Sequence, residues 1–422
     1  MRPSWIPRPP CRPRLPTRPL CRSFTTLGIE TSCDDTCVAL LTTSLSSPKP
    51  HATLPFNSKI TSDNRSFKGI YPPRALDGHA SSLANLVSEA LSTCPGRPDL
   101  VAVTRGPGMS ANLAEGLALG KGLSVAWGVP LVGVNHMQAH ALTPRLVDAL
   151  EMPRDGAKDI EPAFPFLTLL VSGGHTQLVH SRSLTDHRIL ANSANIAIGD
   201  ALDKCARYIL PPDILEACPD VMYARALESF AFPTANGMES YRAPAKRSDE
   251  IQSIVSPHGW TLHPPLSDTR RLGYEFSSLE SLVQGILAAN PDLSTAMRQD
   301  LAVDIMRLAF EHLAGRVLLA LKDLDLSAST LVVSGGVACN KFLMKVLRSM
   351  LDARGHGDMR IVVPPVSLCT DNAAMIAWTG WEMYRAGYES NLDVRPLRKW
   401  GVDPEGADGG ILGVGGWMNR GS

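Results

Sequence analysis

Two histidines and one distant aspartate have the residue types and spacing of a metal site. His136 and His140 lie four residues apart in NHMQAH, after the apolar run 130–134. On a helix they would share one face about one turn apart, which lets two imidazoles bind one metal ion. Such pairs also occur by chance on solvated helices. Met137 stands where a zinc protease would need its glutamate base, so zinc-protease chemistry is disfavoured.

The third candidate ligand is Asp371, in PPVSLCTDNAAMIAWTG. Thr370 or Asp371 is expected to cap a helix that runs through Met375 and Trp378, and a cap aspartate alone is an ordinary helix start. Asp371 follows a strand and a turn much as the histidine pair follows a strand, so a cleft between two lobes would bring the three side chains together. Two histidines and one carboxylate, with open positions for substrate oxygens, would hold a divalent metal.

The tetrapeptide Val-Ser-Gly-Gly occurs twice, at 171–174 and at 333–336, each time at the end of an apolar run. A run that stops at paired glycines predicts a buried strand and a turn where a ligand can approach the backbone closely. A single copy would most often be only a tight turn. Two copies, far apart in the chain, predict an internally duplicated, two-lobed binder of a nucleotide.

Strands and helices must position these residues. The apolar runs 27–29 and 37–41 flank a polar turn and predict a hairpin with Asp34 and Asp35 at its tip. Further strands are expected at 100–104 and 130–134, and helices at 111–126, 196–209 and 301–321.

Two predicted helices would carry candidate site residues. The helix that begins near His136 is expected to reach about Leu142, since Pro144 would interrupt it. On the amphipathic helix 196–209, Asp203 would lie on the polar side. It would be either a surface acid or a carboxylate that binds a ribose hydroxyl.

The composition excludes several classes of protein. The 422 residues, 44% of them hydrophobic, suffice for two domains with sizeable cores. Lysine plus arginine equals aspartate plus glutamate at 41 each, so contact with nucleic acid would need a local basic patch. The nine cysteines form no CxxC pair with zinc-finger spacing, which is typical of reduced thiols in an intracellular protein. No run reaches the roughly 18 apolar residues that span a bilayer.

The first 24 residues differ from the rest of the chain. No acidic residue occurs from Met1 to Ile29, whereas arginine recurs at positions 2, 8, 12, 14, 18 and 22. This composition resembles a mitochondrial transit peptide, although the many prolines also suit a disordered tail. We therefore expect residues 1–24 to lie outside the fold and the protein to localise to the mitochondrion.

Several blocks, in order from about residue 27 to 387, resemble the signatures of the tRNA N6-adenosine threonylcarbamoyltransferases, the TsaD family with its mitochondrial relatives. They read GIETSCDDT, TRGPGMSANLAEGLALGKGL, HMQAH, FLTLLVSGGHTQLV, GDALDKCAR, VSGGVACNKFL and CTDNAAMIA. The resemblance implies an α/β fold with two lobes, the duplicated fold of actin-like ATPases and sugar kinases. The expected lobes are 25–150 and 151–395, with an irregular insertion near 210–267 and a tail at 396–422.

The resemblance also implies a reaction. Threonylcarbamoyl would pass from threonylcarbamoyl-AMP to N6 of the adenosine 3′ of the anticodon, in tRNAs that read codons beginning with adenine. By motif, His136, His140 and Asp371 become the ligands of one divalent metal ion per subunit, zinc or iron. Asp35 would help to deprotonate or orient the attacking amine. Contacts to the adenylate would come from Leu170, Val171, Ser172, Gly173, Gly174, Asp203 and Asn340. The expected partners are tRNA and threonylcarbamoyl-AMP, without a membrane, and a homodimer is possible.

Two other interpretations stay open. A sugar or acid kinase of the same fold class would bind ATP and a small hydroxyl substrate, but such kinases hold magnesium mainly through carboxylates and phosphates. A non-catalytic scaffold would keep the nucleotide fold and lose the chemistry. The block FSSLE motivates it, because Ser278 and Glu280 replace the glycine and lysine of the family pattern. The family's Pro-Gly-Gly-Pro turn is also missing from CPDVMYARALESF.

Overall fold

The structure is a computed structural model that describes residues 23–44, 49–67, 69–94, 96–151, 159–193, 195–324, 326 and 328–420. The expected leader, 1–24, lies outside the described residues except for its last two, which already belong to the first strand. Within the described ranges, no helix is both long and apolar enough to cross a membrane.

The first lobe is built on a five-stranded sheet with the order β3-β2-β1-β4-β5. Its strands are β1 (Ser23–Glu30), β2 (Asp35–Ser44), β3 (His51–Thr61), β4 (Leu100–Gly106) and β5 (Leu131–Asn135). Neighbours among β1, β2 and β3 are antiparallel, whereas β4 runs parallel to β1 and β5 parallel to β4. The predicted hairpin is confirmed, with Ile29 opposite Val38.

The second lobe repeats this topology. Its sheet has the order β12-β11-β6-β7-β8, with strands β6 (Phe166–Val171), β7 (Thr176–Ser181), β8 (His187–Asn192), β11 (Thr330–Ser334) and β12 (Arg360–Val362). Neighbours among β6, β7 and β8 are antiparallel, and β11 runs parallel to both β6 and β12. The predicted duplicated, two-lobed α/β fold is therefore confirmed.

The repeated tetrapeptide does not mark this duplication. Residues 171–174 lie at the end of β6, the counterpart of β1, whereas 333–336 lie at the end of β11, the counterpart of β4. Both copies belong to the second sheet, on neighbouring parallel strands with Ser334 opposite Leu170. The predicted duplication of the fold is correct, but the repeated tetrapeptide on which it was based lies at the ends of two adjacent strands of one sheet.

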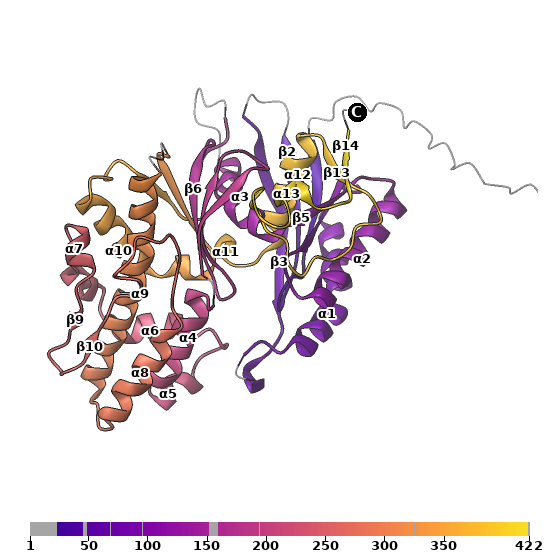
Figure 1. Ribbon diagram of the computed structural model, residues 1–422. Coiled ribbons are helices and arrows are strands. Elements are labelled where there is room, and N and C mark those ends of the chain that lie inside the picture. Colours follow the sequence, from indigo (N-terminus) through magenta and orange to yellow (C-terminus); the bar gives the residue numbers. More distant parts are fainter. Residues whose placement is uncertain are drawn as a thin grey trace, which may run out of the picture.

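Helices cover the outer faces of both sheets (Figure 1). The first sheet packs against α1 (Pro72–Ser92) and α2 (Ser110–Trp127). The second sheet shares its largest core with α4 (Ile198–Ile209), α8 (Ser278–Ala289), α9 (Thr295–Asp323) and α10 (Lys341–Ala353). The helices predicted at 111–126, 196–209 and 301–321 correspond to α2, α4 and α9.

Two helices fill the space between the sheets, α3 (His136–Leu150) and α12 (Ala373–Arg385). They share one core with Cys37 of β2, Phe166 of β6 and Val332 of β11. Phe166 of β6 belongs to this core and Leu167, Leu169 and Val171 to the outer one, because successive strand residues point to opposite faces. Both faces of the second sheet are therefore covered.

The remaining elements are short. They are η1 (Arg65–Phe67), α5 (Pro212–Glu216), α6 (Ala224–Ala231), η2 (Ala235–Ser240), α7 (Arg247–Glu250), β9 (Ile254–Val255), β10 (Thr261–Leu262), η3 (Gly336–Cys339), α11 (Val366–Cys369), β13 (Tyr388–Ser390), α13 (Gly410–Gly413) and β14 (Trp417–Asn419). The expected insertion, 210–267, contains the elements from α5 to β10.

The predicted end of α3 is wrong. The helix continues through Pro144 to Leu150 and leaves Pro144 buried. The hydroxyl of Thr143 donates to the carbonyl of Ala139 at 2.8 Å and so adds a bond next to the position where proline lacks its N–H. Packing between the two sheets outweighs the cost of the proline.

α12 returns to the first sheet although it follows strands of the second, and Figure 1 draws it beside β2 and β5. An added Cβ on Gly28 of β1 would lie 2.3 Å from the carbonyl oxygen of Ala373, and one on Gly380 would lie 2.4 Å from Cβ of Ala102. Glycine at these two positions permits the close approach. The chain from about residue 373 therefore packs with the first sheet, which differs from the expected division of the lobes at 395.

Candidate functional site

The carboxyl ends of neighbouring parallel strands meet at one edge of the first sheet. β1 ends at Glu30, β4 carries Thr104 near its end, and β5 ends at Asn135. In the second sheet, β6 and β11 end at Val171 and Ser334, just before the paired glycines. Strand ends of this kind are where open α/β sheets bind ligands.

The histidine pair follows directly from the end of β5. Oδ1 of Asn135 accepts the N–H groups of Met137 at 3.0 Å and Gln138 at 3.1 Å, which caps α3 and makes His136 its first residue. His140 lies one turn later, and the two ring centroids are 4.7 Å apart. The prediction that both imidazoles share one helix face is confirmed.

Asp371 approaches the pair from the start of α12. Oδ1 of Asn372 accepts the N–H of Met375 at 2.9 Å, so Asn372 caps α12 and the cap predicted one or two residues earlier is wrong. The Asp371 carboxylate instead faces the imidazoles. Its Oδ1 lies 3.1 Å from Nε2 of His140 and 3.5 Å from Nε2 of His136.

These three side chains fit a metal ion. One ligand atom from each of His136, His140 and Asp371 lies within 4.8 Å of the others. Ligand atoms about 2.0–2.2 Å from a tetrahedral zinc ion lie roughly 3.4 Å apart, close to the two distances to Asp371. Two histidines and one carboxylate also form the set that binds iron(II), and either metal would keep open positions for other ligands.

Glu30, which the sequence analysis did not single out, orients His136. Its Oε2 lies 3.1 Å from Nδ1 of His136 and accepts the hydroxyl of Thr104, while its Oε1 accepts the N–H of Ser32. A carboxylate on the second imidazole nitrogen fixes the tautomer that leaves Nε2 for a metal. The sequence feature that could have identified Glu30 is an acidic residue at the end of an apolar strand. In the structure, Glu30 is fully buried.

The electrostatics of the site favour a cation. Burial alone would lower the pKa of His136, but the carboxylates of Asp371 and Glu30 outweigh it and hold that pKa well above its usual value. Burial would likewise raise the pKa of each carboxyl group, but His136 outweighs it and lowers both. One fully buried and one partly buried carboxylate therefore flank the imidazoles, and a metal ion would replace the proton on Nε2 of His136.

Asp35 lies at the start of β2, and each of its carboxylate oxygens has a partner. Oδ2 accepts the ammonium of Lys59 at 2.9 Å, and Oδ1 accepts the hydroxyl of Thr61 at 2.5 Å. Burial raises the pKa of Asp35, although Lys59 opposes the shift. Lys59 also donates to the hydroxyl of Thr370 at 3.3 Å, so Asp35 helps to tie β2 and β3 to the residue before Asp371. A role for Asp35 in proton transfer stays a prediction.

The glycine turn after β6 faces open space. The N–H of Ser172 donates to the carbonyl of His175 at 2.9 Å and closes the turn. A Cβ added to Gly173 or Gly174 would meet nothing within 4 Å. Leu170 and Val171, also predicted contacts, lie within β6 with their side chains buried. Ser172 and the two glycines are therefore the part of the segment that a ligand can reach.

The second glycine turn has a different role. Gly335 has a φ of +102°, and a Cβ there would lie 2.4 Å from the carbonyl oxygen of Val171. Gly335 therefore lets the end of β11 pack against the end of β6, whereas Gly173 leaves space in front of the turn.

Asp203 and Asn340, predicted to contact the adenylate, both have partners within the second lobe. Oδ1 of Asp203 accepts the N–H of Ala224 at 2.7 Å, at the start of α6, and burial raises the pKa of this carboxyl group to about 7. Oδ1 of Asn340 accepts the N–H of Leu343 at 2.9 Å and caps α10. These bonds position helices, and contact of either side chain with the adenylate stays a prediction.

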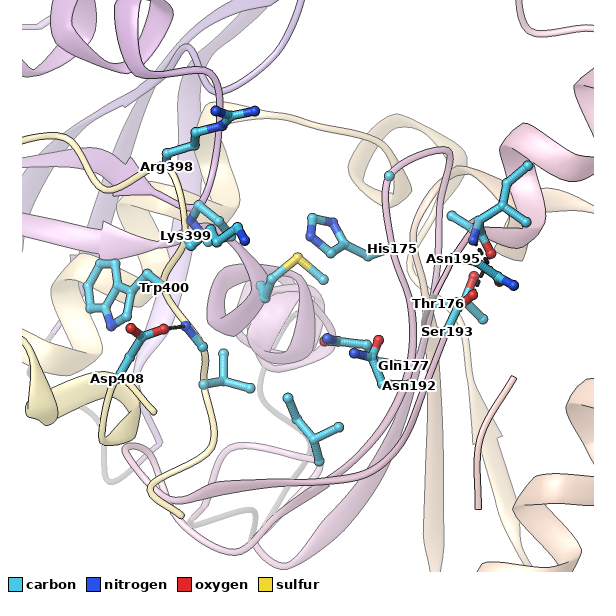
Figure 2. A pocket seen from close by; sticks show the side chains of 18 residues that line it. His175, Thr176, Gln177, Asn192, Ser193, Asn195, Arg398, Lys399, Trp400 and Asp408 are labelled. Atoms are coloured by element: carbon cyan, nitrogen blue, oxygen red, sulfur yellow. Dashed lines mark hydrogen bonds between the residues drawn. The ribbon is translucent and has the colours of Figure 1, made fainter. Parts of the chain in front are cut away.

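A cavity of about 360 Å³ adjoins the open turn (Figure 2). Strands β7 and β8 line it from the second lobe, and residues 398–402 line it from the opposite side. His175 lies in it, and burial together with His136 and His140 lowers the pKa of His175 to about 4, so its imidazole is neutral at neutral pH. His175 was not among the predicted site residues, although it follows the first tetrapeptide directly.

Comparison with known proteins gives a consistent result. The family model of TsaD, described as tRNA N6-adenosine threonylcarbamoyltransferase, matches residues 56–378. The mitochondrial tRNA N6-adenosine threonylcarbamoyltransferase of Schizosaccharomyces pombe is 38% identical over 416 residues, covering 94% of this chain and 90% of the relative. The enzyme of the same name from Cereibacter sphaeroides is 33% identical over 392 residues, covering 90% of this chain and 95% of the relative.

The site predicts tight binding of one divalent ion. Removing a ligand with His140→Ala should weaken zinc affinity by more than about 100-fold, and Glu30→Gln, which removes only the charge behind His136, should weaken it by about 10–100-fold. Competition titration against a metal-binding dye measures both. His258→Ala is the control, because His258 pairs with Asp300 and is not among the proposed ligands. Full metal occupancy in His140→Ala would overturn the assignment.

The two glycine turns should respond differently to alanine. Gly173→Ala fills open space, so it should change the free energy of unfolding by less than about 0.5 kcal/mol and weaken the binding of AMP. Gly335→Ala should lower the free energy of unfolding by about 1–3 kcal/mol, because its Cβ overpacks against Val171. Urea unfolding and calorimetric titration with AMP separate the two effects. Normal AMP binding by Gly173→Ala would mean that this turn only shapes the sheet.

Proposed function

The chain belongs to the TsaD family of tRNA N6-adenosine threonylcarbamoyltransferases, and we propose that its donor is threonylcarbamoyl-AMP and its acceptor the adenosine 3′ of the anticodon. The tRNAs would be those that read codons beginning with adenine. The observation that carries the proposal is the convergence of His136, His140 and Asp371 beside an open glycine turn. Membership of this family also sets aside the small-molecule kinase as the main alternative.

The chemistry of the acceptor explains why such a site is needed. An exocyclic adenine amine is a poor nucleophile because its lone pair is delocalised into the ring, so the carbonyl that it attacks must be polarised. A divalent cation, zinc or iron, held by His136, His140 and Asp371 would supply Lewis-acid polarisation of the donor's oxygens. Adenylate is then a good leaving group.

The protein's own groups would hold the donor around that ion. The turn at Ser172, Gly173 and Gly174 leaves room for a phosphate to approach backbone N–H groups. Glu30 would keep His136 in the correct tautomer throughout. Neutral His175, next to the turn, can exchange a hydrogen bond with the donor or with the amine without adding charge.

Reconstituted transfer tests the proposal. Metal-loaded protein mixed with threonylcarbamoyl-AMP and a tRNA that reads an adenine-initial codon should form N6-threonylcarbamoyladenosine, measured by mass spectrometry of the digested nucleosides. His140→Ala should form at least about 100-fold less, since it removes a metal ligand, and His258→Ala should match the unmodified protein. A tRNA with guanosine at the acceptor position should give no product. Phosphorylation of a small hydroxyl compound by ATP, with no modified tRNA, would favour the kinase instead.

We also propose that the protein works in mitochondria, and that it does so as a homodimer. The S. pombe relative is named as mitochondrial, and residues 1–24 have the arginine-rich, acid-free composition of an import signal. Fused to a fluorescent protein, residues 1–24 should direct it to mitochondria, and residues 25–422 alone should stay outside. Import of residues 25–422 would contradict the first proposal, and a monomer in sedimentation analysis would contradict the second.

A further inference from the structure

The cavity beside His175 adjoins the proposed metal ligands without containing them. His136, His140 and Asp371 are absent from its lining, whereas Met137, the residue after His136, and His175, at the end of the open turn, are part of it. Gly174 of the open turn also lines the cavity, so a ligand there would lie next to a donor held at the metal and would share that turn with it.

One wall of the cavity presents two carboxamides, those of Gln177 and Asn192. Gln177 of β7 and Asn192 of β8 are directly opposite in the antiparallel register, so their side chains lie on the same face of the sheet. Figure 2 shows the two side chains next to each other in the cavity. Among the residues drawn in Figure 2, neither carboxamide forms a hydrogen bond. Each therefore keeps both a donor and an acceptor for a ligand.

The opposite wall carries two cations and one carboxylate, Asp408, whose Oδ2 accepts the N–H of Gly401 at 2.9 Å. We call residues 395–402 the strap. It exposes Arg398 and Lys399, which form no ion pair with any residue that the structure describes. In Figure 2, Lys399 extends from the strap toward His175. Because the whole chain has no net charge, two cations that outnumber the one carboxylate of this lining are a local feature that suits an anionic ligand.

The strap is held rigidly to the metal site. The guanidinium of Arg105 donates to the carbonyl of Arg395 at 3.1 Å, and Nδ2 of Asn135 donates to the carbonyl of Trp400 at 3.0 Å. Trp400 itself is buried. Asn135 is the residue that caps α3 immediately before His136, so a single side chain fixes both the strap and the first metal ligand.

We propose that this cavity receives the acceptor adenosine of the tRNA, with the edge of its base at Gln177 and Asn192 and the neighbouring phosphates at Arg398 and Lys399. This inference rests on the proposed function. Asparagine and glutamine carboxamides match the donor and acceptor pattern of an adenine edge. Proteins recognise unpaired loop bases by taking them out of the stack, while arginine and lysine bind the flanking phosphates.

Binding of a synthetic RNA tests the inference without turnover. The metal-loaded protein should bind a 17-nucleotide anticodon stem-loop, roughly the length of a tRNA anticodon arm, and the double variant Arg398→Ala/Lys399→Ala should bind it at least about tenfold more weakly. The logarithmic salt dependence of its affinity should also become less steep, by about 0.7 for each phosphate that the variant no longer neutralises. The matched control is Arg270→Ala/Lys345→Ala, which removes the same charge from two residues that pair with Asp323 and Glu239.

Steady-state kinetics then separates the acceptor from the donor. Arg398→Ala/Lys399→Ala should raise the KM for tRNA about tenfold and leave the KM for threonylcarbamoyl-AMP within twofold. Gln177→Leu/Asn192→Leu should lower kcat/KM for the stem-loop about tenfold, since it removes the base contacts and keeps the cations. An increase in the donor KM alone would assign the cavity to the donor and overturn the inference. Unchanged stem-loop binding in an active enzyme would also overturn it, whereas strap-dependent binding without any transfer would count only against the proposed function.

Discussion

The candidate site depends on the close packing of α12 against the first sheet. The helix follows strands of the second sheet, yet Gly28 and Gly380 let its backbone and the strands of the first sheet approach within distances that no Cβ would allow. Asp371 precedes the helix by two residues, so this packing brings its carboxylate to the histidines at the start of α3. Residues more than 200 positions apart in the sequence thus form one site because of where one helix packs.

The second constraint is electrostatic. Glu30 is fully buried and Asp371 partly buried, and burying a charge costs several kcal/mol unless it is paired. His136 lies between them, 3.1 Å from one and 3.5 Å from the other, and supplies that pairing. The same arrangement suits a divalent cation, which would be attracted by both anions and would leave the hydrogen bond to Glu30 intact. The site is therefore arranged for a positive charge before any ligand arrives.

The two halves of the duplicated fold use the same strand order for different tasks. The end of the first sheet supplies Glu30 and the capping residue Asn135, whereas the end of the second supplies the open turn at Gly173 and Gly174. α3 and α12 lie between them; α3 carries His136 and His140, and Asp371 lies two residues before α12. The cavity at His175 spans the same boundary, with carboxamides from one half and the strap from the other. Activated donor and RNA acceptor would thus meet where the two sheets face each other.

The local features of the site were predictable from the sequence. The spacing of His136 and His140 on one helix face, the hairpin at Asp34 and Asp35, and the glycine turn after β6 all depend on residues within one turn or one hairpin of each other. The resemblance of the motif blocks to the TsaD family was confirmed by comparison.

Tertiary structure decided the rest. It placed Glu30 behind His136, let α3 continue through Pro144, gave the cap of α12 to Asn372 and showed that the repeated tetrapeptide marks adjacent strands. Each of these outcomes depends on packing or on charges contributed by segments far apart in the chain. The spacing of residues within one helix or turn determines which side chains share a face. The partner of each side chain is determined only when elements far apart in the sequence pack against each other.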